Sequence, residues 1–317
     1  MKFALLLAAG GLNDEAADLL EATRQQIPNS FPVLYALGVI SVSAKRYEKA
    51  EEYFTAALSV KPEDVDTLRA LAKAARASGN LEKALAHLVQ ARRISPQAPG
   101  VLYDFGATAL QMGLVLDALP AFQRLNDLHP REPAYVYALA AARLRKGELK
   151  EAERLSRRYI ELRPRDSAGF YLLGASLYLL NRYVEARTAL ERSLRLRPDA
   201  DAEYLLGLML YEEGNRAAAI ERLLRVVRLR PEHAGAQAAL GAAYRDLGNY
   251  VGARAALERS VELDPKDLRA SYQLGLVYGK LGDKEAAKKM FDRADELRAE
   301  QREHETIILK LIDPPQP

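Results

Sequence analysis

The chain has 317 residues, of which 49% are apolar and 28% are charged, so it can bury a core and still present a polar surface. Forty-six basic and 43 acidic side chains leave a net charge of only +3, which argues against the strong field expected for nucleic-acid or anionic-membrane binding. The absence of cysteine excludes disulfide frameworks, zinc–thiolate sites and thiol nucleophiles.

The first residues, MKFALLLAAGG, have the layout of a signal peptide, but their apolar stretch is at the lower length limit. Ala16 and Pro28 fit the register of later repeats, which favours a first helix of a helical pair over cleavage. The longest uncharged run, residues 27–44, contains two prolines and several polar residues, so we expect no membrane span. For the cellular compartment we favour the cytoplasm, or the periplasm if the chain is a fragment of a longer exported protein.

The chain repeats itself with a period of about 34 residues. We divide it into a truncated unit, eight full units and a tail: 1–30, 31–64, 65–98, 99–132, 133–166, 167–199, 200–233, 234–267, 268–301 and 302–317. Little more than a turn separates the units. The sequence therefore predicts one continuous array over residues 1–301, followed by a helical extension with a proline-rich end.

Three columns of residues set the register. Alanine recurs in all nine units, at Ala16, Ala50, Ala84, Ala118, Ala152, Ala186, Ala219, Ala253 and Ala287. A glycine column is broken only by Lys45 and Asn181, and a proline follows each alanine by twelve residues in eight units. Apolar residues at i, i+3, i+4 and i+7 predict two helices per unit. Glycine suits the left-handed end of the first helix, and proline stops the second.

The small residue at Gly38, Ala72 or Gly106 and the alanine column mark where the two helices of a unit cross closely. Together with Leu-Gly at positions seven and eight and a bulky residue at position 24, these columns make the chain similar to the tetratricopeptide repeat family. That resemblance implies an all-α, right-handed superhelix of about nine units, whose first helices line a concave groove. Eight full units would complete roughly one superhelical turn.

The pattern is irregular between residues 113 and 160. Pro120 falls inside a predicted second helix, which it should kink or start late. In the next unit Arg143 replaces an apolar residue, Ser156 a large one and Tyr159 a small one. We therefore predict that the array bends or loosens in this segment.

Both ends lack the polar terminal face that such arrays need. Leu5, Leu6 and Leu7 should have little cover at the start. At the end, Ala299 replaces the proline, so the helix should continue through REHETIILKLID and expose Ile307, Ile308, Leu311 and Ile312. Either the chain is cut from a longer protein or a second copy covers its ends.

No catalytic, metal or cofactor site is predicted. The four histidines form no i, i+4 ligand pair, and no phosphate-binding loop or nucleophile elbow is present. Paired glutamates are ordinary on solvated helix faces. The arginines of the second helices are interleaved with glutamates, which fits a solvated convex face better than an RNA-binding one. We expect a protein that is not an enzyme and needs no cofactor.

Tyrosine recurs at position five of the first helix, which in the resembled family faces the groove. These residues, with Tyr178 and Tyr211 two turns further on, form the predicted groove wall: Tyr35, Tyr103, Tyr137, Tyr171, Tyr178, Tyr204, Tyr211 and Tyr272. Their rings could hold an extended peptide, or they could mainly pack against the next unit. Both interpretations remain open.

In unit 65–98, Arg69 replaces the tyrosine, and Lys73 and Arg76 share its helical face. Three stacked cations destabilise a helix, so they suggest an anionic partner such as an acidic side chain or a peptide C-terminus. Asp66 and Asp104 could instead neutralise them. The stripe differs from the carboxylate clamp of chaperone-binding relatives, because Lys73 and Ala107 stand where that clamp has asparagines.

The sequence thus favours a non-catalytic scaffold that binds a protein segment in its concave groove, without nucleic acid or a membrane span. One alternative is a substrate-recruiting or regulatory arm of a larger enzyme or bacterial envelope assembly. Another is a spacer that self-assembles into a homo-oligomer through its uncapped ends.

Overall fold

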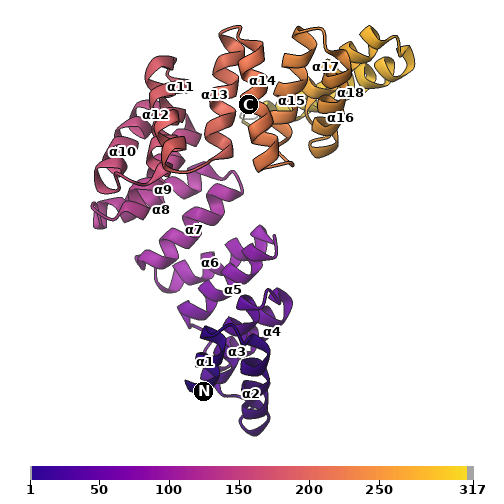
Figure 1. Cartoon of the computed structure of the whole chain (residues 1–317). Helices are drawn as coiled ribbons and strands as arrows, with labels where there is room; N and C mark the ends of the chain where they lie inside the picture. The colour runs from indigo at the N-terminus through magenta and orange to yellow at the C-terminus, as the bar shows by residue number, and fades with distance from the viewer. Residues whose placement is uncertain (1, 313–317) are drawn as a thin grey trace, which may run out of the picture. The chain divides into compact units, whose positions relative to one another are not determined.

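The computed structural model describes residues 2–312, with side chains for residues 3, 4 and 6–300, and in this range its regular secondary structure is all α-helix. The chain divides into two compact units, Met1–Arg163 and Pro164–Pro317. Each unit is a stack of antiparallel helix pairs, so the expected all-α solenoid architecture is confirmed (Figure 1).

The first unit contains ten helices among the described residues: α1 (Lys2–Ala9), α2 (Asn13–Gln26), α3 (Phe31–Ser43), α4 (Tyr47–Val60), α5 (Val65–Ala77), α6 (Leu81–Ile94), α7 (Pro99–Gln111), α8 (Val115–Leu128), α9 (Pro133–Lys146) and α10 (Leu149–Leu162). The second unit contains eight described helices: α11 (Ser167–Leu179), α12 (Tyr183–Leu196), α13 (Ala200–Glu212), α14 (Arg216–Leu229), α15 (Ala234–Asp246), α16 (Tyr250–Leu263), α17 (Leu268–Leu281) and α18 (Lys284–Ile312).

Each odd-numbered helix packs against the even-numbered helix that follows it, and these pairs stack in chain order within each unit. The odd-numbered helices also contact one another: α3 meets α5, α5 meets α7 and α7 meets α9, as α11, α13, α15 and α17 do in the second unit. The odd-numbered helices therefore form a continuous layer in each unit, as expected for stacked repeats.

The alanine column lies at the crossing of each helix pair. Eight of its nine members, Ala16 to Ala253, are completely buried. The facing glycines leave no room for a side chain: a Cβ atom on Gly38 would lie 2.6 Å from Cδ1 of Phe54. This close approach confirms why small residues recur at these two positions.

The turn between the helices of each pair requires a left-handed residue, and all nine turns have one. Seven use glycine, while Lys45 and Asn181 adopt φ angles of 58° and 59°. The prediction that this column provides the left-handed backbone at the end of the first helix is thus confirmed. It holds even at Lys45 and Asn181, where a residue with a Cβ atom adopts the same backbone.

Pro120 does not delay its helix. α8 begins at Val115, at the same repeat position as the other second helices, so that part of the expectation is wrong. The turn before the proline is held by the buried Ala118, whose N–H donates to the carbonyl of Leu114, while Pro120 itself faces solvent.

The irregular residues of the fourth full unit each have a local partner. Ser156 is buried with its hydroxyl bonded to the carbonyl of Ala152, and the nearby Tyr159 packs its ring 5.3 Å from that of Tyr137. Arg143 pairs with Glu148 and donates to Gln123. The chain divides into its two compact units just beyond this segment, between Arg163 and Pro164.

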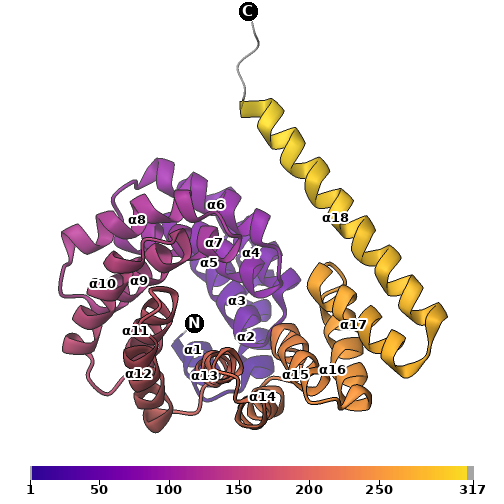
Figure 2. The ribbon, with the colours of Figure 1, turned by 90° about the horizontal axis from the view of Figure 1, so that it is seen from above.

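The terminal helices differ from the expectation in part. Leu6 is 70% exposed, as predicted, whereas Leu7 packs against the core formed by α1, α2 and α3, and Leu5 lies outside the described side chains. Helix α18 continues past its partner α17 to Ile312 (Figure 2). The side chains of Ile307, Ile308, Leu311 and Ile312 lie outside the described residues. No helix in the described chain combines the length and apolarity needed to cross a bilayer.

Candidate peptide-binding site

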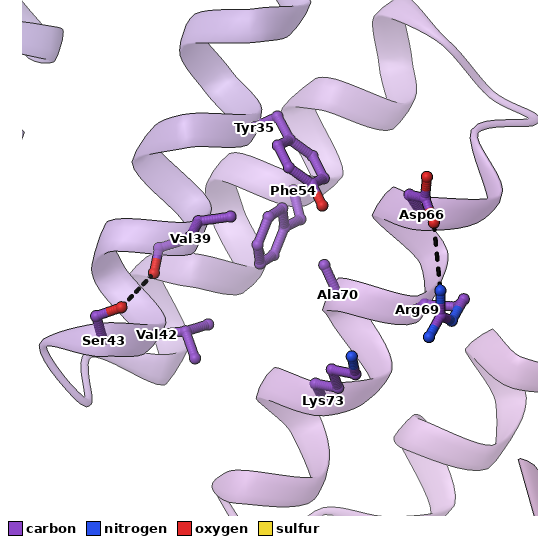
Figure 3. Close-up of a pocket in the computed structure, with 9 residues that line it drawn as sticks. All are labelled: Tyr35, Val39, Val42, Ser43, Phe54, Asp66, Arg69, Ala70 and Lys73. Carbon is purple, nitrogen blue, oxygen red and sulfur yellow. Dashed lines mark hydrogen bonds and ion pairs between the residues drawn. The ribbon is translucent and has the colours of Figure 1, made fainter. Parts of the chain in front are cut away.

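An open pocket of about 260 Å³ lies between α3 and α5 on the layer of odd-numbered helices. Its walls and floor come from two adjacent repeats, as Figure 3 shows: Tyr35, Val39, Val42, Ser43, Phe54, Asp66, Arg69, Ala70 and Lys73. Three of the sequence-predicted groove residues, Tyr35, Arg69 and Lys73, are therefore brought together in one pocket. Arg76 follows one turn later on α5 and is not part of its lining.

The apolar part of this pocket was not predicted from the sequence. Val39, which is 38% exposed, projects beside the half-buried Tyr35, and the buried Phe54 of α4 lies behind both. The rings of Tyr35 and Phe54 are 5.6 Å apart. Val39 occupies the ninth position, where four of the eight full repeats have alanine, and that departure is the signal that could have identified it.

The charged rim comes from α5. Asp66 has a 76% exposed side chain and lies 3.4 Å from the guanidinium of Arg69. Burial raises the pKa of the Tyr35 hydroxyl, and the negative charges of Asp66 and Asp64 raise it further. The carboxylates at the N-terminal end of α5 therefore help to keep the hydroxyl of the pocket-lining Tyr35 protonated.

Arg69 does not stand free among the described residues. Its Nε donates to Oδ2 of Asp104 at 2.8 Å, and the Asp104 side chain is only 9% exposed. Figure 3 shows the guanidinium on the side of α5 away from Tyr35 and Phe54. A Cβ atom on Gly100 would lie 2.7 Å from an Nη atom of Arg69, so this side chain is packed against the start of α7.

Lys73 and Arg76 differ from Arg69. Among the described residues, neither cation has an ion pair or a side-chain hydrogen bond. Lys73 is exposed at the C-terminal end of the pocket. The predicted three-cation stripe thus divides into one arginine neutralised by the next repeat and two cations without a described partner.

The other predicted tyrosines of the first unit, Tyr103 and Tyr137, are half-buried. The ring of Tyr103 lies 6.1 Å from Phe122, and that of Tyr137 lies 5.3 Å from Tyr159. Together with the contact between Tyr35 and Phe54, these pairs show that the three position-five rings of the first unit each rest on an aromatic residue of their own second helix. One face of each of these three rings therefore packs within its own repeat.

The second unit contains the other five tyrosines of the predicted groove wall. Tyr171 and Tyr204 are half-buried, and Tyr204 packs 4.6 Å from the His233 ring with its hydroxyl against Gly235. Tyr272 is 44% exposed and contacts Phe291 at 5.5 Å. Of the five, Tyr272 presents the largest accessible surface.

Tyr178 and Tyr211 use their hydroxyl groups within the array. Tyr178 donates to Glu212 at 2.7 Å and Tyr211 to Asp246 at 2.8 Å, in each case one repeat later. Burial raises the pKa of both phenols, and the accepting carboxylates raise it further. Their hydroxyls therefore serve first as links between repeats.

The described side chains contain no group of three or more histidine or acidic residues placed to hold a metal ion. The ionisable groups that depart from their ordinary pKa are explained by burial, by side-chain hydrogen bonds and by ion pairs, as in the i,i+3 pair of Glu151 and Arg154 within α10. The pocket presents an apolar surface beside the exposed Asp66 carboxylate and the exposed Lys73 amine.

Comparison with known families agrees with the repeat pattern. Tetratricopeptide repeat models match residues 6–74, 41–103, 171–231 and 268–301, and a TPR repeat model matches residues 241–282. A model of the anaphase-promoting complex, cyclosome, subunit 3, matches residues 117–193. A comparison with curated protein sequences found no match.

Solved structures show the same fold at low identity. A tetratricopeptide repeat protein from Parabacteroides merdae is 19% identical, with a TM-score of 0.63 over 72% of this chain and 91% of its own. The Cut9–Hcn1 hetero-tetramer of the APC/C gives the same identity and TM-score over 90% of this chain, which spans 56% of that one. A monomeric mutant of IFIT1 with Gppp-AAAA is 17% identical, with a TM-score of 0.56 over 89% of this chain and 73% of its own.

These likenesses establish the fold alone. The repeated alanine and glycine columns, the stacked helix pairs and the successive family matches have one explanation, and the chain belongs to the tetratricopeptide repeat proteins.

Proposed function

We propose that this protein is a non-catalytic scaffold that binds segments of other proteins on the layer formed by its odd-numbered helices. The observation that carries the proposal is the pocket between α3 and α5, which combines an apolar floor with the cation of Lys73. Among the described residues, Lys73 has no ion-pair partner. A tyrosine face beside exposed aliphatic side chains suits peptide binding, because a rigid ring loses little conformational entropy.

The accessible tyrosines and the basic residues contribute differently to this proposal. Tyr35 and Tyr272 supply ring surface, whereas Tyr178 and Tyr211 have hydroxyls committed to the next repeat. Lys73 and Arg76 supply positive charge for an acidic side chain or a peptide carboxylate. Arg69 contributes by holding α5 against α7.

Site-specific photocrosslinking tests the scaffold role directly. A benzophenone side chain would replace Val39 or Tyr272 on the odd-numbered helices, with Val184 of α12, which is 82% exposed, as the control position. After irradiation in a lysate of the source cells, we expect protein adducts at Val39 or Tyr272 that excess unlabelled chain suppresses. Adducts at Val184 alone, or equally at all three positions, would contradict a binding surface on this layer.

A second test uses truncation of the accessible rings. With the benzophenone at Val39, Tyr35→Ala and Tyr272→Ala should each reduce recovery of the crosslinked partner, identified by mass spectrometry, while far-UV circular dichroism stays that of the helical fold. Unchanged recovery with the fold intact would exclude these rings from binding.

A further inference from the structure

The two charged ends of the α3–α5 pocket point to a more specific ligand, an inference that rests on the proposed scaffold function. Asp66 and Lys73 both line the pocket and lie seven residues apart on α5. Seven residues correspond to about 10 Å along a helix. The pocket therefore has a negative end and a positive end with an apolar centre between them.

The charges at both ends remain available to a ligand. Lys73 has no ion pair among the described residues, and Arg76, one turn beyond it, has none either. Asp66 has a 76% exposed side chain, and its contact with Arg69 is long, at 3.4 Å. Arg69 itself is satisfied by the shorter bond to the buried Asp104, so it does not cancel Asp66 fully.

The centre of the pocket is apolar and small. Val39, Val42, Phe54 and Ala70 line it together with the Tyr35 ring, and Ala70 leaves the space that a larger residue on α5 would fill. A volume of about 260 Å³ accommodates an aliphatic side chain of a ligand, since a cavity of about 150 Å³ already holds benzene.

An extended peptide advances about 3.3 Å per residue and turns alternate side chains to the same side. Three alternate residues, i, i+2 and i+4, thus span about 13 Å, close to the separation of Asp66 and Lys73 once flexible side chains adjust. An apolar residue at i+2 would then enter the pocket while i and i+4 reach its two charged ends.

We propose that the pocket binds an internal segment of a partner protein in which an aliphatic residue is flanked, two residues away on each side, by a basic and an acidic residue. The basic side chain pairs with Asp66 and the acidic side chain with Lys73. Because these charges lie at opposite ends of the pocket, a peptide bound in one chain direction is selected by the order of its charges.

Fluorescence anisotropy with the full chain and labelled peptides tests this proposal. All peptides are blocked at both ends, and their cores are Lys-Ser-Leu-Ser-Glu, Glu-Ser-Leu-Ser-Lys, Lys-Ser-Leu-Ser-Lys, Glu-Ser-Leu-Ser-Glu and Lys-Ser-Ser-Ser-Glu. One of the two oppositely charged leucine peptides should bind best, with each like-charge peptide weaker by about two- to fivefold, since exposed ion pairs contribute little each. Replacing leucine by serine should cost about tenfold or more, because the burial of the side chain is lost.

The decisive variant exchanges the charges of α5, as Asp66→Lys with Lys73→Glu. Its preference between the two oppositely charged peptides should reverse, whereas exchange of Lys49 and Glu52, both exposed on α4 and outside the pocket lining, should leave the preference unchanged. Lys73→Gln is a milder second variant, which should weaken only peptides that contain glutamate. Far-UV circular dichroism checks the fold of each variant.

A preference that does not reverse, or equal binding of like-charged and oppositely charged peptides, would overturn the proposal. The leucine peptides are also measured with an unblocked C-terminus, and binding by these alone would overturn the proposal too, because the pocket would then capture a chain end. Crosslinking at Val39 that succeeds while the peptides fail would leave the scaffold role standing and remove only this ligand class.

Discussion

The hydroxyl group of Tyr211 donates to Oδ2 of Asp246 at 2.8 Å and so ties α13 to α15 one repeat later. Tyr178 and Glu212 form the equivalent link between α11 and α13. Both tyrosines occupy the twelfth position of a repeat, and both acceptors occupy the thirteenth position of the next. The links therefore hold neighbouring repeats at the surface that we propose for binding.

Tyr211→Phe should weaken this link without opening a cavity. The net contribution of such a hydrogen bond is about 0.5–1.5 kcal/mol, and Asp246 keeps Arg245 and Arg216 as partners, so we expect a loss at the low end of that range. Urea denaturation followed by circular dichroism measures it. Tyr250→Phe, at a phenol for which no hydrogen bond is found in the described chain, is the matched control and should change stability less.

Gly38 and Gly279 should respond in opposite directions to alanine. A Cβ atom on Gly38 would press against the Phe54 ring, so Gly38→Ala should destabilise the chain by about 1–3 kcal/mol. Gly279 lies in α17 with nothing within 4 Å of the new atom, so Gly279→Ala should stabilise it by up to about 1 kcal/mol. Equal effects of the two substitutions in denaturation experiments would show that the crossing at Gly38 tolerates a Cβ atom, which would contradict this account.

The left-handed turn residues give a second contrast. Lys45 holds a φ of 58° against the steric preference of its Cβ, so Lys45→Gly should raise the unfolding free energy by up to about 1 kcal/mol. Asn181→Gly should gain less, because asparagine tolerates this backbone and its side chain accepts a hydrogen bond from Tyr183. Thermal denaturation of the two variants would compare these effects, and a larger gain at Asn181 would contradict this account.

Features that repeat along the chain could be predicted from the sequence, because each follows from a local requirement. The alanine column identifies the helix crossings, and the turn column identifies positive φ angles even at Lys45 and Asn181. No pairwise contact is needed for either inference. The continuation of the last helix, α18, could also be predicted, because Ala299 stands where the other repeats have the proline that ends the second helix.

The candidate site depends on contacts between repeats, and these were predicted less well. For Arg69 the sequence left two interpretations open, a cation that meets a partner and a cation neutralised by Asp66 and Asp104, and only the structure shows that its side chain reaches Asp104 in the next repeat. The pocket also depends on Val39 and Phe54, which become neighbours only when α3 and α4 pack. Side-chain direction decides both cases, and residue type alone does not specify it.

His233 should make stability depend on pH. Its Nδ1 accepts the N–H of Ala236 at 3.1 Å and so caps α15, which requires the neutral ring. Burial lowers the pKa of His233 below its ordinary value of 6.5, against the opposing effect of Asp201. The unfolded chain therefore binds the proton more readily, and stability falls as pH drops below about 6.5, until the lower folded pKa is reached.

His233→Asn keeps a capping oxygen but removes this titration. The difference in unfolding free energy between wild type and variant should therefore shrink or change sign in favour of the variant as pH falls from neutral through that window. The comparison cancels the contribution of His87, whose pKa burial also lowers. A difference that is constant with pH would rule out the capping role assigned to the neutral ring.

Arg69 and Lys73 should separate stability from binding. Arg69→Ala leaves the buried carboxylate of Asp104 without its partner, so it should cost about 1–3 kcal/mol in denaturation experiments. Lys73→Ala removes an exposed cation that has no described partner and should change stability by less than about 0.5 kcal/mol.

For peptide binding we expect the opposite order: Lys73→Ala should have a larger effect than Arg69→Ala. Lys73→Ala should weaken capture of a glutamate-containing peptide and flatten its salt dependence, because a screened attraction has been removed. The double variant with Arg69→Ala should flatten the salt dependence little further, since Arg69 is already paired with Asp104. If Lys73→Ala left the salt response unaltered while Arg69→Ala abolished it, the binding charge would be Arg69, and the division of the basic stripe into a structural and a recognising part would be wrong.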